Sequence, residues 1–213
     1  MDPFSSLVST AVVLPVDDVD TDQIIPARFL KITDRNGLGP HAFADWRYDA
    51  SGAPRADFPL NAAGAREAKI LVAGRNFGCG SSREHAAWAL HALGIRAIIS
   101  ASFADIFRAN ALSNGMLPVV LSEAEHVAMV RELSRSPNVP LRIDLPSQSV
   151  TLLKDAGLRG LRGLRGLRCT FSIDAFAKHC LLHGVDHLGY LLDAAPDIAA
   201  YETSHHAPLC TTC

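Results

Sequence analysis

The chain lacks an excess of charge of either sign, and it lacks any apolar run of membrane-spanning length. In its 213 residues, 20 Lys and Arg oppose 22 Asp and Glu, for a formal net charge of −2. This balance gives no overall attraction to nucleic acid or to an anionic membrane, so we expect neither as a partner. No stretch approaches the roughly 18 apolar residues of a spanning helix, and residues 1–4 lack the basic flank of a signal peptide. We therefore expect a cytoplasmic protein.

Cysteine is scarce, and its placement suggests no disulfide framework. The five cysteines are Cys79, Cys169, Cys180, Cys210 and Cys213. An odd number, scattered through a chain long enough to bury its own core, favours reduced thiols. Cys210 and Cys213 have the spacing of metal ligands, but no second pair accompanies them. The sequence therefore predicts no metal site on this chain and a flexible tail over residues 204–213.

Between residues 69 and 134, apolar strand-like runs alternate with helical patterns. Strands are expected at 69–73, 97–101 and 117–121, and helices at 82–93, 103–114 and 122–134. This alternation is typical of a parallel sheet with crossover helices. Ser122 and Glu125 have the spacing of a capping box, and Gly94 and Gly115 follow helices where a left-handed residue is favoured. The local signals agree on an α/β fold.

The flanking segments predict further elements. A valine-rich strand is expected at 9–14, a strand at 169–173, and a helix capped by Asp174 after it. Residues 141–145 and 149–153 alternate in polarity around a turn and predict an antiparallel hairpin. Residues 35–57 mix Gly, Pro, Asp and aromatic side chains, which indicates a long irregular excursion of the kind that carries function.

Residues 157–168 consist of four copies of Gly-Leu-Arg. A period of three residues matches neither a helix nor a strand, and the prolines of collagen are absent. We expect an exposed loop insertion over residues 154–168. The alternative is a basic patch that contacts an acidic partner through its arginines. These are Arg159, Arg162, Arg165 and Arg168.

The string from Asn76 to His85 places two hydroxyls and an arginine on a glycine-rich turn after a predicted strand. Ser81 and Glu84 have the spacing of a capping box, which predicts a helix start close to the serines. Such a start favours a carboxylate or phosphate, and Arg83 can hold that anion bidentately. A plain capped helix after a tight turn is the alternative for a bare Ser-x-x-Glu.

Two features surround this string. Its glycines, Gly74, Gly78 and Gly80, allow backbone angles that other residues avoid and let a ligand approach the main chain. An acidic turn over residues 17–22 either binds a cation or uses its short side chains to accept backbone N–H groups. The turn lacks the glutamate that closes a calcium-binding loop, so the cation interpretation is weak.

Three strings in this order resemble the small subunits of 3-isopropylmalate dehydratase, the isomerase of leucine biosynthesis, and more distantly the swivel domain of aconitase. They are Val19–Pro26, Asn76–His85, and Ser102–Phe107 with Asn110, Asn114 and Gly115. The resemblance covers roughly residues 7–202. It implies a swivelling β/β/α domain over residues 1–203, with a mixed sheet that closes into a small barrel flanked by helices.

The resemblance also implies a site and a partner. A separate large subunit would hold a [4Fe-4S] cluster whose open iron acts as a Lewis acid, with no cofactor on this chain. Ser81 matches the catalytic base, Arg83 matches the carboxylate-binding arginine, and Ser82 would add a hydrogen bond. Thr21 and Asp22 would line the opposite wall and orient Arg83 or Ser81.

The implied reaction is a hydro-lyase isomerisation of 2-isopropylmalate to 3-isopropylmalate by dehydration and rehydration. Substrate choice is associated with residues 29–46, from which no side-chain pocket can be deduced. A dehydratase for another small 2-hydroxy dicarboxylate, citramalate (through citraconate) or homocitrate, therefore stays open. So does a non-catalytic carboxylate-binding module. A serine hydrolase is disfavoured because the string contains no Gly-x-Ser-x-Gly.

Overall fold

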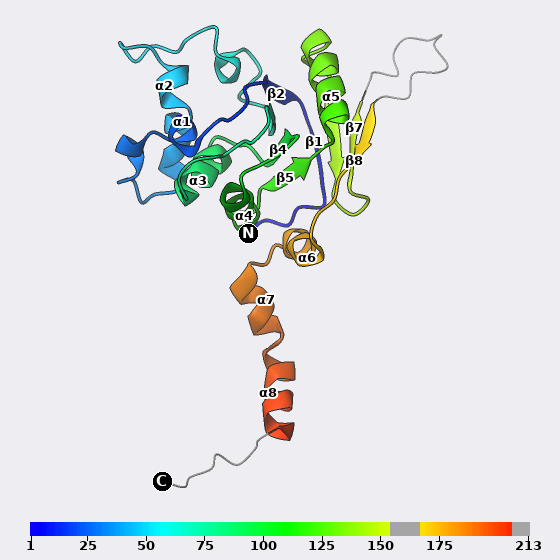
Figure 1. Ribbon diagram of the computed structural model, residues 1–213. Helices are drawn as coiled ribbons and strands as arrows, with labels where there is room; N and C mark the ends of the chain where they lie inside the picture. The colour runs from blue at the N-terminus through cyan, green and yellow to red at the C-terminus, as the bar shows by residue number, and fades with distance from the viewer. Residues whose placement is uncertain (154–166, 206–213) are drawn as a thin grey trace, which may run out of the picture.

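The computed structural model describes residues 1–153 and 167–205, which form two sheets and their covering helices (Figure 1). The first sheet is parallel and has the order β2-β3-β4-β5. Its strands are β2 (Ala11–Leu14), β3 (Ile70–Ala73), β4 (Ala97–Ser100) and β5 (Leu117–Val120). Helices α3 (Glu84–Ala92) and α4 (Asp105–Ser113) connect β3 to β4 and β4 to β5. The predicted alternation of strands and helices is confirmed.

The predicted helix ends in this region hold as well. Helix α5 (Glu123–Arg135) begins with a complete capping box, in which the Ser122 side chain accepts from the Glu125 N–H and the Glu125 carboxylate accepts from the Ser122 N–H. Gly94 and Gly115 follow α3 and α4 with φ of 104° and 74°. These left-handed angles end the helices where the sequence predicted.

The second sheet is antiparallel and has the order β1-β6-β7-β8. Its strands are β1 (Ser6–Ser9), β6 (Leu141–Asp144), β7 (Ser149–Leu152) and β8 (Arg168–Thr170). The predicted hairpin is confirmed, with Leu141 opposite Leu152. The strand expected at residues 9–14 is confirmed over residues 11–14 as β2, whereas β1, which joins the other sheet, was not predicted. The sequence pattern does not reveal that the strands on either side of Thr10 have different pairing partners.

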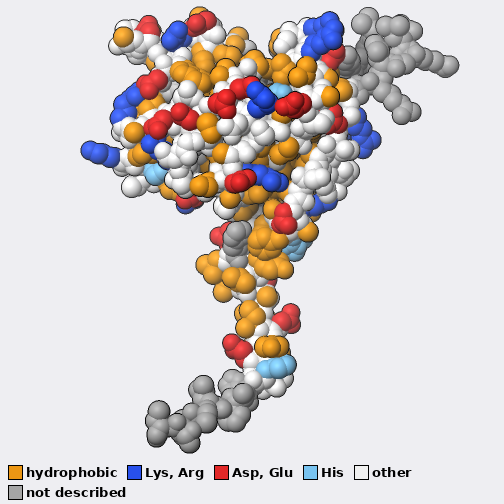
Figure 2. Space-filling model, viewed as in Figure 1, with side chains coloured by type: hydrophobic (Ala, Val, Ile, Leu, Met, Phe, Trp, Pro, Cys, Tyr) orange, Lys and Arg blue, Asp and Glu red, His pale blue; other side chains and the backbone are white. Residues whose placement is uncertain are grey.

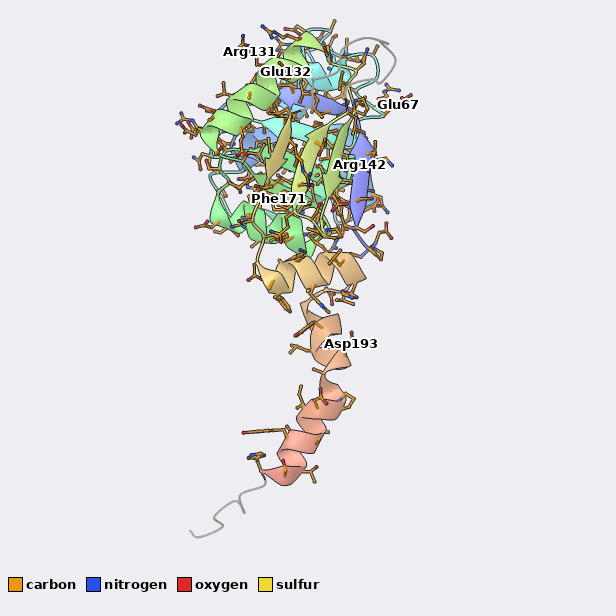
Figure 3. The ribbon with its side chains drawn as sticks, turned by 90° about the vertical axis from the view of Figure 1, so that its right-hand side faces the viewer. Glu67, Arg131, Glu132, Arg142, Phe171 and Asp193 are labelled. Carbon is orange, nitrogen blue, oxygen red and sulfur yellow. The ribbon has the colours of Figure 1, made fainter. Side chains whose placement is uncertain are left out.

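The two sheets and the helices make layers around two apolar clusters. Leu71, Ala73 and Ile98 of the parallel sheet pack against α3, α4 and the excursion after β2. Ile70 and Val72 lie on the opposite face with the antiparallel sheet and α5. Figure 3 views that second sheet, with Arg142 on β6 and Phe171 after β8. The α/β class and a layered β/β/α arrangement are therefore present, although the described ladders show two sheets and no closed barrel.

The excursion between β2 and β3 contains only short helices. They are α1 (Thr21–Ile24), η1 (Ala27–Phe29), η2 (Asn36–His41), α2 (Ala44–Arg47) and η3 (Pro59–Asn61). Its aromatic residues form the apolar cluster on that side, with the Phe43 ring 5.8 Å from Trp46 and 5.9 Å from Phe58 between centroids. Burying side chains of this size stabilises the fold by about 1.5–3 kcal/mol each.

In the described part of the chain, three helices follow the second sheet. Helix α6 (Ala175–His183) begins at Asp174, whose carboxylate accepts from the N–H groups of Phe176 and Ala177, so the predicted cap is confirmed. Helices α7 (His187–Asp193) and α8 (Ala195–Ser204), which we call the C-terminal arm, project away from the body (Figure 1). No described helix is long and apolar enough to cross a membrane.

Two predictions fall mostly outside the described residues. The Gly-Leu-Arg insertion begins within residues 154–166, and the tail continues through residues 206–213. The last repeat is visible at its end, where the Leu167 carbonyl accepts from the Leu152 N–H at 2.9 Å and Arg168 opens β8. The proposed division of the chain at residue 204 stays a prediction.

Candidate active site

The loop over residues 76–83, which we call the anion loop, leaves the carboxyl end of β3 as predicted. It is tied to two neighbouring segments by backbone hydrogen bonds. The Phe77 N–H donates to the Ser102 carbonyl at 3.1 Å, and the Gly78 N–H donates to the Val19 carbonyl at 2.7 Å. The Cys79 carbonyl then accepts from the Thr21 N–H at 2.8 Å. The three strings noted in the sequence therefore meet at one edge of the parallel sheet.

The glycines of this region serve protein packing. Gly78 has a φ of 79°, and a Cβ there would lie 2.2 Å from the Phe107 ring, which is buried. Gly80 also has a positive φ, of 89°. Gly74 has no positive φ, but a Cβ there would lie 2.2 Å from the Val16 carbonyl oxygen. The predicted left-handed angles are thus confirmed at Gly78 and Gly80, and the close approach that the structure shows is made by the protein's own atoms.

The predicted capping box at Ser81 and Glu84 is wrong. Helix α3 begins at Glu84, and Arg83 occupies the cap position without a side-chain hydrogen bond to the helix. The Glu84 carboxylate instead accepts from Trp88 Nε1 and from Asn114 Nδ2, both at 3.1 Å. A spacing of three residues permits a capping box but does not exclude a stronger tertiary partner for the glutamate. Ser81 and Ser82 are left exposed, just before the helix start.

Thr21 and Asp22 lie beside the anion loop. Thr21 is buried, and its hydroxyl donates to the Ser81 carbonyl at 3.0 Å. Asp22 accepts a hydrogen bond from the Arg83 guanidinium, whose side chain is 17% exposed. The structure thus brings Thr21 and Asp22 of the first string next to the two loop residues, Ser81 and Arg83. One bond fixes the backbone at the serine and the other aims the arginine.

Helix α1, which carries Thr21 and Asp22, has its own cap. The Asp20 carboxylate accepts from the Gln23 N–H at 2.8 Å, and the Gln23 side chain accepts from the Asp20 N–H at 2.9 Å. This capping box was not recognised in the sequence, although the spacing of Asp20 and Gln23 carries the signal. Because the box holds the start of α1, it fixes where Thr21 and Asp22 stand relative to the loop.

The other carboxylates of the acidic turn are hydrogen-bonded within the protein. Asp17 accepts from the Arg75 N–H and guanidinium, which lowers the pKa of Asp17 below its usual value. Asp18 accepts from the Asn76 side chain at 2.8 Å. Among the described residues, no group of His, Cys, Asp and Glu is arranged to hold a metal ion. Of the two interpretations of this turn, the structure shows the one in which side chains accept N–H groups.

Cys79 lies in the middle of the anion loop and is a thiol. Its Sγ donates to the Asp18 carbonyl at 3.3 Å. Burial, followed by the nearby Asp20 and Asp18 carboxylates, raises the pKa of the Cys79 thiol. The side chain therefore stays neutral near pH 7, and it adds no negative charge that would oppose an anionic ligand.

A polar cluster behind the loop was missed in the sequence. Asn114 accepts from Trp88 Nε1 at 3.0 Å while its own amide donates to Glu84, and the Arg35 guanidinium lies 4.4 Å from the Trp88 ring centroid. His85 also packs against Trp88, with ring centroids 4.6 Å apart. Asn114 stood out in the third string, but nothing local showed that it reaches α3. The cluster links the helix start after Arg83 to the excursion.

Residues 29–46, which the resemblance associates with substrate choice, lie next to α1. Arg28 precedes it and makes a bidentate ion pair with Asp45, an exposed pair that contributes little to stability. The Phe29 and His41 rings stack with centroids 4.1 Å apart. These contacts fold the segment back on itself beside the first string.

Comparisons with known proteins agree with one another. Residues 1–124 match the family described as Aconitase C-terminal domain. The 3-isopropylmalate dehydratase small subunit of Chloroflexus aurantiacus is 52% identical over 211 residues, which is 99% of this chain and 100% of that protein. The protein of the same name from Anaeromyxobacter dehalogenans is 54% identical over 202 residues, 95% and 98% of the two chains. A crystal structure of 3-isopropylmalate dehydratase from Methanocaldococcus jannaschii aligns with a TM-score of 0.63 at 28% identity, covering 92% of this chain and 99% of that chain.

Proposed function

The chain belongs to the family of 3-isopropylmalate dehydratase small subunits, and on that premise we propose that it works with a separate large subunit as a hydro-lyase. The pair isomerises 2-isopropylmalate to 3-isopropylmalate in leucine biosynthesis. Water leaves across two neighbouring carbons and returns in the opposite sense. The active site must therefore remove a proton from carbon, assist the departure of a hydroxyl, and hold the carboxylates of the substrate.

One observation carries the assignment of residues: the paired contacts from Thr21 to Ser81 and from Asp22 to Arg83. In this proposal Arg83 binds a substrate carboxylate through its planar fork, and Asp22 keeps that fork in place. Ser82, exposed beside it, donates a further hydrogen bond to the substrate. The buried Thr21 fixes the Ser81 backbone, so the serine oxygen has a defined position.

Ser81 is the proposed base. A serine oxygen becomes basic only where positive charge stabilises its alkoxide. Two sources of such charge lie close by, because Arg83 follows two residues later and α3 begins at Glu84 with its positive dipole end toward the loop. Since Ser81 does not cap the helix, its oxygen stays available to accept the substrate proton as the alkoxide.

The chemistry at the hydroxyl needs a Lewis acid, which a [4Fe-4S] cluster supplies when bound by the large subunit. Cluster ligands are thiolates. The described cysteines suit that role poorly, since Cys79 is hydrogen-bonded in the loop and burial raises the pKa of Cys169 to about 11. These observations support placing the cluster on the partner and none on this chain.

The exposure of Ser81 and Ser82 also supports a two-chain site. Dehydration chemistry requires that bulk water be excluded, and the anion loop alone offers one wall. A large subunit lying over the loop supplies the other wall.

We propose in addition that the protein works in the cytoplasm. We also propose that the two sheets together form the small closed barrel implied by the family resemblance.

Reconstitution tests the proposal. The isolated chain should be colourless, bind no stoichiometric iron and turn over no substrate, whereas addition of the purified, cluster-loaded large subunit should give interconversion of 2- and 3-isopropylmalate. Citramalate and homocitrate should be assayed in parallel, because either could prove to be the better substrate. A complex that forms but converts none of the three acids would support a carboxylate-binding module and refute the enzyme.

A further inference from the structure

Large apolar side chains gather on the surface of the C-terminal arm. Three of them lie on one face of α7, at the spacings of three and four residues that recur on the same side of a helix. They are Leu188, Leu191 and Leu192, which are 63%, 57% and 62% exposed, and Ile198 on α8 adds a side chain that is 45% exposed. Figure 2 shows hydrophobic side chains gathered at the base of the body and along the arm on the face in view. An apolar face this exposed is typical of an interaction site.

The arm has little support of its own. Helices α7 and α8 contain 7 and 10 residues, and isolated helices shorter than about 12–15 residues are marginal in water. Its aromatic contacts with the body lie at the root, where the Tyr190 ring packs almost perpendicular to the rings of Phe176 and His179, at 4.8 and 5.3 Å between centroids. Binding of a partner along the apolar face would supply the missing stabilisation.

A groove runs from the root of the arm to the start of helix α3. Its volume is about 750 Å³, and it runs from Glu84 past Arg108 and Leu112 to Phe176 and Leu188. Glu84 directly follows Arg83 in the chain, so this end of the groove lies one residue beyond the anion loop.

We propose that the large subunit covers the C-terminal arm, reaching it along this groove from the anion loop. The proposal rests on the proposed function, which already places the large subunit over Ser81. Charge argues against a second copy of this chain, because residues 184–213 contain four Asp and Glu and no Lys or Arg, so two arms would repel. The surface that fits is apolar with a basic rim.

The test compares full-length variants for binding to the purified, cluster-loaded large subunit by sedimentation velocity. Leu188→Ser combined with Leu191→Ser and Leu192→Ser should raise the dissociation constant by at least about 30-fold, the effect of truncating a binding hot spot. The turnover number at saturating large subunit should stay unchanged, because the anion loop is intact. Val127→Ser is the matched control, since Val127 on α5 is 64% exposed and lies on the body.

Charge supplies a second, independent variant. Asp193 lies on the arm beyond α6 (Figure 3), and Asp193→Lys with Asp197→Lys should weaken assembly with a loss that shrinks at high salt. Unchanged affinity in both arm variants would overturn the proposal. If the variant with three Leu→Ser substitutions altered only the self-association of the isolated chain, the proposal would also be overturned, in favour of a second copy as the partner of the arm. A wild-type complex that forms without turnover would instead refute the proposed function and leave the docking result standing.

Discussion

The anion loop and the C-terminal arm are both exposed, but they are held in opposite ways. The loop is fixed by bonds to residues distant in the sequence, such as Val19 and Ser102, and it packs over the buried Phe107. The arm is held chiefly by hydrogen bonds within its own helices. A segment anchored by tertiary contacts can keep catalytic atoms in place without a partner. A segment held mainly by its own hydrogen bonds can adapt to the surface that it meets.

The comparison is sharpest for Ser81→Ala. Removing the proposed base should lower turnover by about 10²–10⁴-fold, while binding of the large subunit stays normal. Initial rates and sedimentation velocity on the same samples separate the two effects. Ser82→Ala is the control from the same loop, and loss of one neutral hydrogen bond should cost about 10-fold or less. Equal effects of the two substitutions would mean that Ser81 is not the base.

Arg83→Lys should have the next largest effect. An ammonium cannot reproduce the planar fork, and loss of a charge-assisted hydrogen bond costs about 1.5–3 kcal/mol, or roughly 10- to 150-fold in kcat/KM. Much of the loss should be a rise in KM. Asp22→Asn keeps the guanidinium of Arg83 but weakens the bond that holds it in place. The kcat/KM of this variant should therefore lie between that of wild type and that of Arg83→Lys. An unchanged KM in the Arg83→Lys variant would show that the carboxylate binds elsewhere.

A pair of glycine substitutions tests whether the loop is the more rigid region. Gly78→Ala forces a side chain into a left-handed φ and against Phe107, so it should lower the free energy of unfolding by about 1–3 kcal/mol. Gly189 lies within α7, and Gly189→Ala should change that free energy by less than about 1 kcal/mol. Urea denaturation at neutral pH measures both. Equal losses at the two sites would break the distinction drawn between loop and arm.

The smallest effect concerns the hydrogen bonds between Asp17 and Arg75, the residue just before the anion loop. Hydrogen bonds from Arg75 lower the pKa of Asp17 below 3.8 in the folded state. The resulting stabilisation is present above the unfolded pKa and disappears as the pH falls through the folded pKa. The difference in unfolding free energy between wild type and Asp17→Asn should therefore shrink below about pH 4. Denaturation curves at pH 3 and pH 6 that give the same difference would contradict this account.

The sequence predicted what depends on neighbours in the chain. The parallel strands, the capping box at Ser122, the left-handed Gly94 and Gly115 and the cap at Asp174 all follow from spacing within a few residues. The failures depend on distant partners. Glu84 bonds to Asn114, 30 residues away, in place of the predicted Ser81 box, and β1, whose partner is β6, was not predicted.

The candidate site follows the same rule. The family resemblance named Thr21, Asp22, Ser81 and Arg83, and the structure shows which atoms of these residues meet. Spacing alone could not show that Thr21 reaches the Ser81 carbonyl, because the two lie on different strand-to-helix connections. The cluster around Asn114 was missed for the same reason. The catalytic and binding roles of Thr21, Asp22, Ser81 and Arg83 remain predictions.

The break at Thr10 has a consequence for how the protein is made. Strand β1 pairs with β6, where Ser6 lies opposite Asp144, whereas β2 pairs with β3 much earlier in the chain. As the chain leaves the ribosome, β2 can find its partner while β1 must wait, unpaired, until β6 has been synthesised. Two strands separated by one residue thus form their hydrogen-bonded pairs at different times. The N-terminal strand stays unpaired for most of the time that synthesis takes.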